Sequence, residues 1–92
     1  MVKAAARHIL VETKKQAEDI KSKIAKGEDF GEMAKKFSQC PSGKQGGKLG
    51  EFTPGQMVKE FDLVVFSAEV GKVHGPVQTE FGYHLIEITR RG

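Results

Sequence analysis

The 92-residue chain has little cysteine, no tryptophan and no long apolar run, and these shortages exclude several classes of protein. A single cysteine cannot form an intramolecular disulfide, so a disulfide-stapled domain is excluded and a reducing compartment is favoured. No apolar run approaches the roughly 20 residues of a membrane-spanning helix. The first residues have an alanine run but no apolar h-region, which does not indicate a secretory signal. We therefore expect a cytoplasmic protein that does not act at a membrane, although a domain cut from a longer exported protein would have the same features.

An excess of charge of one sign is also missing. The chain has 15 lysines and arginines against 12 acidic residues, a net charge of +3. The lysines of the first half alternate with acidic residues, as on solvated helix faces, and no aromatic residues are interleaved with them. Nucleic-acid binding is therefore not expected as the main role. With 38% hydrophobic residues, the length predicts one globular domain over residues 1–92, which we expect to be a monomer.

The first half of the chain has the pattern strand, helix, helix. Residues 4–11 alternate with period two, which predicts a strand with His8 on an apolar face. Residues 13–16 form a capping box that begins a helix, and Gly27 stands where a glycine commonly follows a helix end. A second start signal covers residues 29–32. The helix that it begins has one apolar stripe, made by Phe30, Met33, Ala34 and Phe37.

The second half begins with a loop-rich segment. Five of the eleven glycines lie between residues 41 and 55, together with Pro41 and Pro54, and leave room for one short strand over 48–52. A further amphipathic helix pattern follows, with Met57, Phe61, Val64 and Val65 on one side.

The remaining residues predict a turn and a last strand. Gly75-Pro76 is a turn signal, and we expect His74 to be exposed just before it. Residues 81–90 predict a strand with His84, Ile86 and Ile88 on one face and Phe81, Tyr83 and Leu85 on the other. The order β-α-α-loop-β-α-β-β predicts a small α+β fold, with a mostly antiparallel sheet covered by helices. If the first and last strands are central neighbours, His8 and His84 can face each other.

Two inward-facing histidines are the first candidates for chemistry. A single histidine on an apolar face is most simply a core residue that is hydrogen-bonded to a backbone or hydroxyl group. A pair of them at opposite ends of the chain, His8 and His84, favours a functional interpretation. Neutral imidazole donates from one nitrogen and accepts at the other, so a stacked pair can orient itself and its neighbours.

Cys40 and the glycine-rich segment leave three other interpretations open. Cys40 is either a small apolar filler or, with His8 or His84 as base, the thiolate of a Cys/His hydrolase. A zinc site from the same three residues is conceivable, but they lack the short paired spacing of structural zinc sites. A nucleotide-binding P-loop is excluded, because Lys48 is followed by Leu49 where such a loop needs serine or threonine.

Three groups of segments form a joint pattern over essentially the whole chain. They are His8 to Val11; Phe30 to Ala34 with Ser38, Cys40, Ser42 and Gly46 to Gly50; and Gly55-Gln56-Met57 to Phe61 with Gly75-Pro76-Val77, Thr79 and Phe81 to His84. In these segments and in their order, the chain closely resembles the parvulin family of peptidyl-prolyl cis/trans isomerases. Met33 departs from the family, which more often has a smaller aliphatic residue there. The length matches the minimal, bacterial-type members.

The resemblance implies a parvulin/FKBP-like α+β fold, with the order β-α-α-(short α)-β-α-β-β and a small, mostly antiparallel four-stranded sheet surrounded by about four helices. It also implies a role for each matching residue. It implies catalytic roles for His8, Cys40, Thr79 and His84, with Cys40 beside the rotating bond and Thr79 linked to the histidines. It implies a substrate-binding pocket for the proline ring, made by Leu49, Gln56, Met57, Phe61 and Phe81. Residues 12–13 stand where phosphate-directed parvulins carry a longer basic loop, so specificity for phosphorylated substrates is not expected.

The resemblance also implies the partners and the reaction. The expected substrates are proline-containing polypeptides, unfolded or partly folded, whose folding the enzyme assists. Rotation about a peptide bond breaks no covalent bond, so no metal ion or cofactor is expected. The alternative from another class is a peptide-binding or chaperone module of the same fold with little catalytic role. The presence of both histidines and Cys40 favours the enzyme, because a binding surface needs only the pocket.

Overall fold

The computed structural model of the chain describes residues 3–92. Within these residues the strands are β1 (Ala4–Val11), β2 (Lys48–Phe52), β3 (Val73–Thr79) and β4 (Gly82–Arg91). The helices are α1 (Lys14–Ala25), α2 (Phe30–Phe37), α3 (Lys59–Val65) and a short 3-10 helix, η1 (Pro41–Gln45). The predicted α+β fold is confirmed; residues 1 and 2 of the predicted domain lie outside the described residues. No helix of the described part is both long and apolar enough to cross a membrane.

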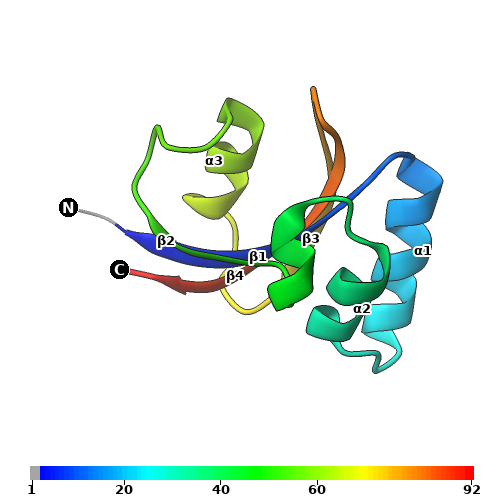
Figure 1. Cartoon of the computed structure of the whole chain (residues 1–92). Helices are drawn as coiled ribbons and strands as arrows, with labels where there is room; N and C mark the ends of the chain where they lie inside the picture. The colour runs from blue at the N-terminus through cyan, green and yellow to red at the C-terminus, as the bar shows by residue number, and fades with distance from the viewer. Residues whose placement is uncertain (1–2) are drawn as a thin grey trace.

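The sheet is antiparallel, with the strand order β2-β1-β4-β3. The first and last strands of the chain are therefore its central neighbours, as the sequence suggested, and they pair up to Val11 opposite Tyr83. The two ends of the described chain lie side by side at one end of the sheet (Figure 1). There Lys3 and Gly92 exchange two backbone hydrogen bonds of 3.0 Å.

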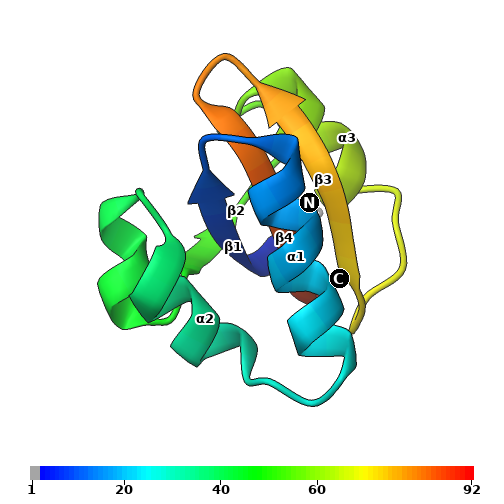
Figure 2. The same cartoon turned by 90° about the vertical axis from the view of Figure 1, so that its right-hand side faces the viewer.

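Helices cover both faces of the sheet, and each face has its own core. Helices α1 and α2 lie on one face and α3 on the other (Figures 1 and 2). The period-two alternation of β1 divides its side chains between the two cores. The core beneath α1 and α2 contains Ile9, Val11, Leu85, Ala17, Ile20, Phe30, Met33 and Ala34. The core beneath α3 contains Ala4, Ala6, Phe52, Phe61, Val65, Ile86 and Ile88.

The two predicted helix starts are confirmed by their capping hydrogen bonds. The Thr13 hydroxyl accepts from the Gln16 backbone N–H at 3.1 Å, and the Asp29 carboxylate accepts from that of Glu32 at 3.0 Å. Each bond satisfies a backbone donor that the first helical turn leaves without a partner. The apolar stripe of α2 is buried except at its end, where Phe37 is 37% exposed.

Four local predictions from the sequence were wrong, and two of them concern β3. Gly75-Pro76 does not form a turn between elements but lies inside β3, where the pairing with β4 shifts register between His74 and Val77. An edge strand tolerates proline, because proline has no N–H to donate to a neighbouring strand. A glycine–proline pair is common both in turns and where the register of a strand is irregular, so its composition alone indicated a turn. His74 is consequently half-buried in β3, with its Nε2 2.7 Å from the Glu69 carbonyl oxygen.

The other differences concern Met57 and Phe81. Met57 precedes α3 and does not belong to it. Phe81 lies in the turn between β3 and β4, so it does not share the face of Tyr83 and Leu85. Each is a loop residue next to a periodic segment, and its spacing continues the pattern of that segment. Periodicity alone does not show where a helix or strand begins or ends.

Gly47 sets how closely the η1–β2 connection approaches β1. Its carbonyl oxygen accepts a hydrogen bond of 3.0 Å from the His8 backbone N–H, and its φ is +85°. A Cβ at this position would lie 2.3 Å from the His8 carbonyl oxygen. Only glycine allows both this conformation and this approach, so Gly47 holds the loop against the strand that carries His8.

Replacing Gly47 by alanine should therefore destabilise the domain more than its backbone conformation alone explains. We expect Gly47→Ala to lower the free energy of unfolding by about 3 kcal/mol or more, since positive φ and a backbone clash add. Gly71 is a matched control, because its φ is +86° and nothing lies within 4 Å of an added Cβ. Gly71→Ala should cost only about 1 kcal/mol. Urea unfolding measures both, and equal losses would contradict the packing argument.

Candidate functional site

The two predicted histidines meet at the centre of the sheet. His8 of β1 and His84 of β4 stack with ring centroids 5.2 Å apart and planes 16° from parallel. Their Nδ1 atoms are 3.0 Å apart, and both side chains are buried, with 6% and 4% of their surface exposed. Two ring nitrogens at this distance share one hydrogen, so each ring must be the donor or the acceptor for the other.

The pair belongs to a longer hydrogen-bonded network. His8 Nε2 is 3.1 Å from Ser42 Oγ, and the Ser42 hydroxyl donates to Cys40 Sγ at 3.3 Å. On the other side, His84 Nε2 is 2.8 Å from Thr79 Oγ1. The network thus joins η1 and the segment before it, both central strands and the end of β3.

The single proton of each hydroxyl fixes the direction of the network. Because Ser42 donates its proton to Cys40, His8 Nε2 must carry a hydrogen and donate to Ser42. In a neutral His8 ring, Nδ1 is then the acceptor for His84 Nδ1–H, and in a neutral His84 ring Nε2 accepts from the Thr79 hydroxyl. This arrangement satisfies all four bonds with both imidazoles neutral.

Burial keeps the two rings neutral. It lowers the pKa of His8 to about 4, with a further contribution from the neighbouring His84. Burial also lowers the pKa of His84 below its ordinary value. A buried imidazolium would lose its hydration, and a second one would be repelled by the first. The pair is therefore a neutral, directional hydrogen-bond relay at neutral pH.

An apolar cavity of about 300 Å³ lies beside the histidines. Phe61 of α3 meets both imidazoles edge-on, with ring centroids 5.7 Å from His8 and 6.0 Å from His84. Phe81 is 61% exposed, so part of its ring remains in contact with solvent. The cavity is lined by His8, Leu10, Cys40, Leu49, Met57, Val58, Phe61, Phe81 and His84.

Hydrogen bonds hold the loop that carries Met57. The Gly55 backbone N–H donates to the Asp62 carboxylate at 2.6 Å, which ties the loop to α3. The Gln56 side-chain oxygen accepts from the Thr53 backbone N–H at 2.6 Å and from its hydroxyl. These contacts fix the turn that directly precedes Met57.

The structure brings most of the predicted site residues together. His8, Cys40, Leu49, Met57, Phe61, Phe81 and His84 line the cavity, and Thr79 contacts it through His84. Gln56 does not line it, because its exposed side chain is turned back onto Thr53.

Sequence reasoning assigned no role to three further residues. Leu10 and Val58 line the cavity, and Ser42 joins Cys40 to His8. The signal for Leu10 was available, because it lies two residues after His8 and thus on the same face of the strand. Ser42 stood in the quoted motif, but nothing in its spacing indicated a contact with His8.

The geometry does not favour the hydrolase or zinc interpretations. Cys40 Sγ is hydrogen-bonded to the Ser42 hydroxyl and not to an imidazole. The nucleophile–base contact of a Cys/His hydrolase is therefore not formed. Each nitrogen of His8 and His84 already has a hydrogen-bond partner. Over residues 3–92, no three His, Cys, Asp or Glu side chains are grouped as metal ligands.

Comparisons with known proteins agree with this site. A sequence model of the rotamase family, described as the PPIC-type PPIase domain, matches residues 2–90. The chain is 52% identical over 88 residues to the foldase protein PrsA of Geobacillus sp. (strain WCH70), covering 95% of the chain and 32% of that protein. The crystal structure of PrsA from Bacillus anthracis superposes with a TM-score of 0.95 and 38% identity, over 99% of this chain and 42% of that one.

Two further relatives have the same fold. The solution structure of NmPin, the parvulin of Nitrosopumilus maritimus, has a TM-score of 0.86 and 43% identity, over 96% of each chain. Another match, with a TM-score of 0.91 and 40% identity, covers 98% of this chain and 39% of that one. It comes from a study of two SurA-like chaperones of Campylobacter jejuni, one of them described as periplasmic. The expected cytoplasmic location gains no support from these relatives.

The matches also define the extent of the similarity. The chain spans about a third of the length of the curated PrsA relatives that it matches. The family model, the sequence alignments and the superpositions each extend over nearly every residue of this chain. The chain belongs to the PPIC-type peptidyl-prolyl cis/trans isomerases, the parvulins.

Proposed function

We propose that the cavity beside His8 and His84 is where this domain rotates X–Pro peptide bonds, by non-covalent stabilisation of the twisted amide. The observation that supports this most is an apolar cavity of about 300 Å³ next to a buried pair of imidazoles that burial keeps neutral. A proline ring fits a pocket with such walls, and the polar network reaches the pocket at Cys40 and at the histidines.

The mechanism follows from the electronic structure of the amide. Rotation costs about 18–20 kcal/mol because the C–N bond has partial double-bond character. The planar amide is charge-separated, and the twisted transition state is less so. An apolar, poorly hydrated site therefore disfavours the planar form relative to the twisted one, which is differential binding of the transition state. Each ~1.4 kcal/mol of such preference increases the rate tenfold.

Each part of the site has a role in this proposal. Leu49, Met57 and Phe61 hold the proline ring, so that one end of the bond is fixed while the carbonyl rotates. Phe81 is 61% exposed, and in this proposal its ring contacts the substrate residues next to the proline. Cys40 adjusts the electrostatics near the carbonyl. The histidines, with Thr79 and Ser42, keep the hydrogen bonds around Cys40 in one arrangement.

Phosphorylated substrates are not preferred in this proposal. A phosphate needs cationic side chains, and among the described residues those lining the cavity include neither lysine nor arginine. The segment after β1 is also short, because Glu12 and Thr13 lead directly into α1.

The wider setting of the domain is proposed on the same grounds. We infer that it acts as a single domain and a monomer on proline-containing, unfolded or partly folded polypeptides, without a nucleic-acid partner. A free-standing chain would work in the cytoplasm, and a chain that is part of a longer exported protein would work outside it. Light scattering after size exclusion tests the oligomeric state.

The pocket can be tested by shortening Met57. We expect Met57→Ala to lower kcat/KM for a tetrapeptide with a central X–Pro bond about tenfold or more, because the proline ring loses one wall. Phe61→Ala should act in the same direction but also removes core packing. Leu63→Ala is the matched control, because Leu63 lies on α3 and is 60% exposed. A folded Met57→Ala protein with full activity would place the reaction elsewhere.

The role of Cys40 separates non-covalent from covalent catalysis. We expect Cys40→Ser to keep substantial isomerase activity, because rotation requires no bond to the carbonyl. Loss of all turnover in a folded Cys40→Ser protein would support a covalent step instead. Stoichiometric acylation of Cys40 by a reactive ester would indicate a hydrolase.

The histidine pair makes stability depend on pH. The pKa of His8 in the folded domain is about 4, below the ordinary 6.5, so the unfolded chain binds more protons as the pH falls. The contribution of neutral His8 to the free energy of unfolding is complete above pH 6.5 and is lost progressively as the pH falls towards 4. We expect the free energy of unfolding to fall by about 2 kcal/mol from pH 7 to pH 5 on account of His8.

Urea unfolding at pH 7 and pH 5 measures this loss. His8→Gln should remove most of it. The control His74→Gln, whose imidazole lies on the edge strand β3, should retain it. An unchanged pH dependence in His8→Gln would show that His8 is not the group that titrates.

A further inference from the structure

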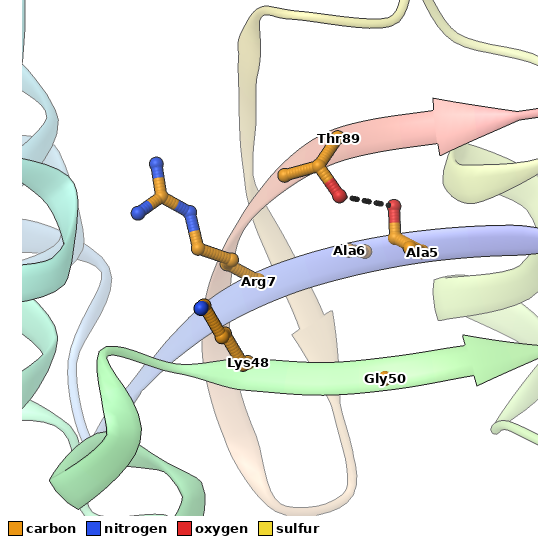
Figure 3. A pocket seen from close by; sticks show the side chains of 6 residues that line it. All are labelled: Ala5, Ala6, Arg7, Lys48, Gly50 and Thr89. Atoms are coloured by element: carbon orange, nitrogen blue, oxygen red, sulfur yellow. Dashed lines mark hydrogen bonds between the residues drawn. The ribbon is translucent and has the colours of Figure 1, made fainter.

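A second cavity lies on the opposite face of β1 from the histidines. Helices α1 and α2 cover only one end of their face of the sheet (Figure 1). The other end holds a cavity of about 390 Å³, lined by Ala5, Ala6, Arg7, Lys48, Gly50 and Thr89 (Figure 3). We call it the sheet groove. Four of the six lining residues are small, namely Ala5, Ala6, Gly50 and Thr89, and nothing lies within 4 Å of the position of a Cβ on Gly50.

One end of the sheet groove is closed by an ion pair. Ala5 lies opposite Glu51 of β2 and Arg90 of β4. Residues directly opposite one another in a sheet point to the same face. The side chains of Arg90 and Glu51 form a salt bridge, which therefore passes across Ala5.

The other end has a cation without a counterion. Arg7 lies opposite Lys48 of β2 and Glu87 of β4. Arg7 Nε donates to Glu87 at 2.8 Å, so this carboxylate is occupied. Lys48 is exposed and makes no salt bridge within residues 3–92. Figure 3 shows the Arg7 and Lys48 side chains leaving neighbouring strands on the same side of the sheet.

The charged side chains that the strands themselves place along the sheet groove sum to an excess of one positive charge. Arg7, Lys48 and Arg90 face Glu51 and Glu87. Like charges directly opposite each other on neighbouring strands destabilise the pairing, and a carboxylate beside Lys48 and Arg7 would remove that repulsion. The sequence around Lys48 adds to this field, because residues 33–50 contain four lysines and no acidic residue.

From this arrangement we propose that the sheet groove binds an extended acidic segment of a polypeptide. One carboxylate pairs with Lys48, and small or β-branched neighbours lie over Ala5, Gly50 and Thr89. β2 is an edge strand, so the groove opens sideways and a chain can continue beyond it. A nucleic acid is a poorer occupant, because its binding depends on several phosphate contacts and only one cation is free within the described site.

The position of the sheet groove adds a second attachment point to the isomerase. Arg7 and His8 are consecutive in β1 and point to opposite faces. A polypeptide held through an acidic segment on one face leaves the cavity on the other face free for its prolyl bond. Binding in the sheet groove requires neither a proline nor the histidine pair, so it is independent of the proposed catalytic role.

The proposal is tested with a proline-free heptapeptide of alternating glutamate and valine. We expect it to shift the backbone amide signals of Ala5, Gly50 and Thr89 in nuclear magnetic resonance spectra of the whole chain. Lys48→Glu should weaken binding at least about fivefold, which corresponds to ~1 kcal/mol for a lost exposed ion pair. Lys59→Glu changes the net charge equally at the start of α3, on the other face, and should leave the affinity within about twofold.

Several results would overturn the proposal. Equal weakening in Lys48→Glu and Lys59→Glu would show a general effect of net charge and no site. Shifts confined to residues around His84 and Phe61 would show that the peptide enters the other cavity. The same shifts on raising the protein concentration without peptide would make a second copy of the chain the occupant, and a stronger response to a short oligonucleotide would make it a nucleic acid.

Discussion

The site depends on the pairing of β1 with β4, which brings the two ends of the chain together at the centre of the sheet. This pairing places His8 and His84 on one face with their Nδ1 atoms 3.0 Å apart. The hydrogen bond between the rings needs one Nδ1 without a proton, and burial keeps both rings neutral at neutral pH. Thr79 and Ser42 occupy the outer nitrogens and so fix which ring donates.

The elements around this pair each contribute one requirement of the site. The loop that ends at Gly47 hydrogen-bonds to the His8 backbone and carries Cys40 and Ser42 to the imidazole. Helix α3 places Phe61 edge-on to both rings, and the Asp62 carboxylate of the same helix holds the loop before Met57. The cavity is therefore shaped by contacts within the protein that need no ligand, which is the preorganisation that the proposed reaction requires.

The two faces of β1 have different chemistry because strand residues alternate. His8 and Leu10 face the apolar cavity, while Ala5 and Arg7 face the sheet groove. Helices α1 and α2 complete the core over Ile9 and Val11 only, which leaves the remainder of that face with small and charged side chains. A fold of this size thus has room for an apolar cavity beside the histidines and for a second, more polar groove on the back of the same strand.

Periodicity and capping signals were sufficient to predict most of the fold. The alternation in β1, the helix starts at Thr13 and Asp29 and the α+β order were all confirmed. The errors concern the irregular part of edge strand β3, where Gly75-Pro76 has the composition of a turn, and the loop residues Met57 and Phe81. Local composition does not distinguish a shift of register inside an edge strand from a turn between elements.

The sequence by itself determined the residue types, the faces of the two central strands and the membership of a family whose motifs extend along nearly the whole chain. Only the tertiary structure decided that Gln56 turns back onto Thr53 and that Ser42 joins Cys40 to His8. It also decided that Lys48 lies opposite Arg7 and forms no salt bridge within the described residues. The physical reason is that hydrogen bonds and charge balance between distant segments depend on how those segments are packed. Local patterns predict on which face of a strand or helix a side chain lies. The residue that it contacts on that face belongs to another part of the chain, and the local pattern does not identify it.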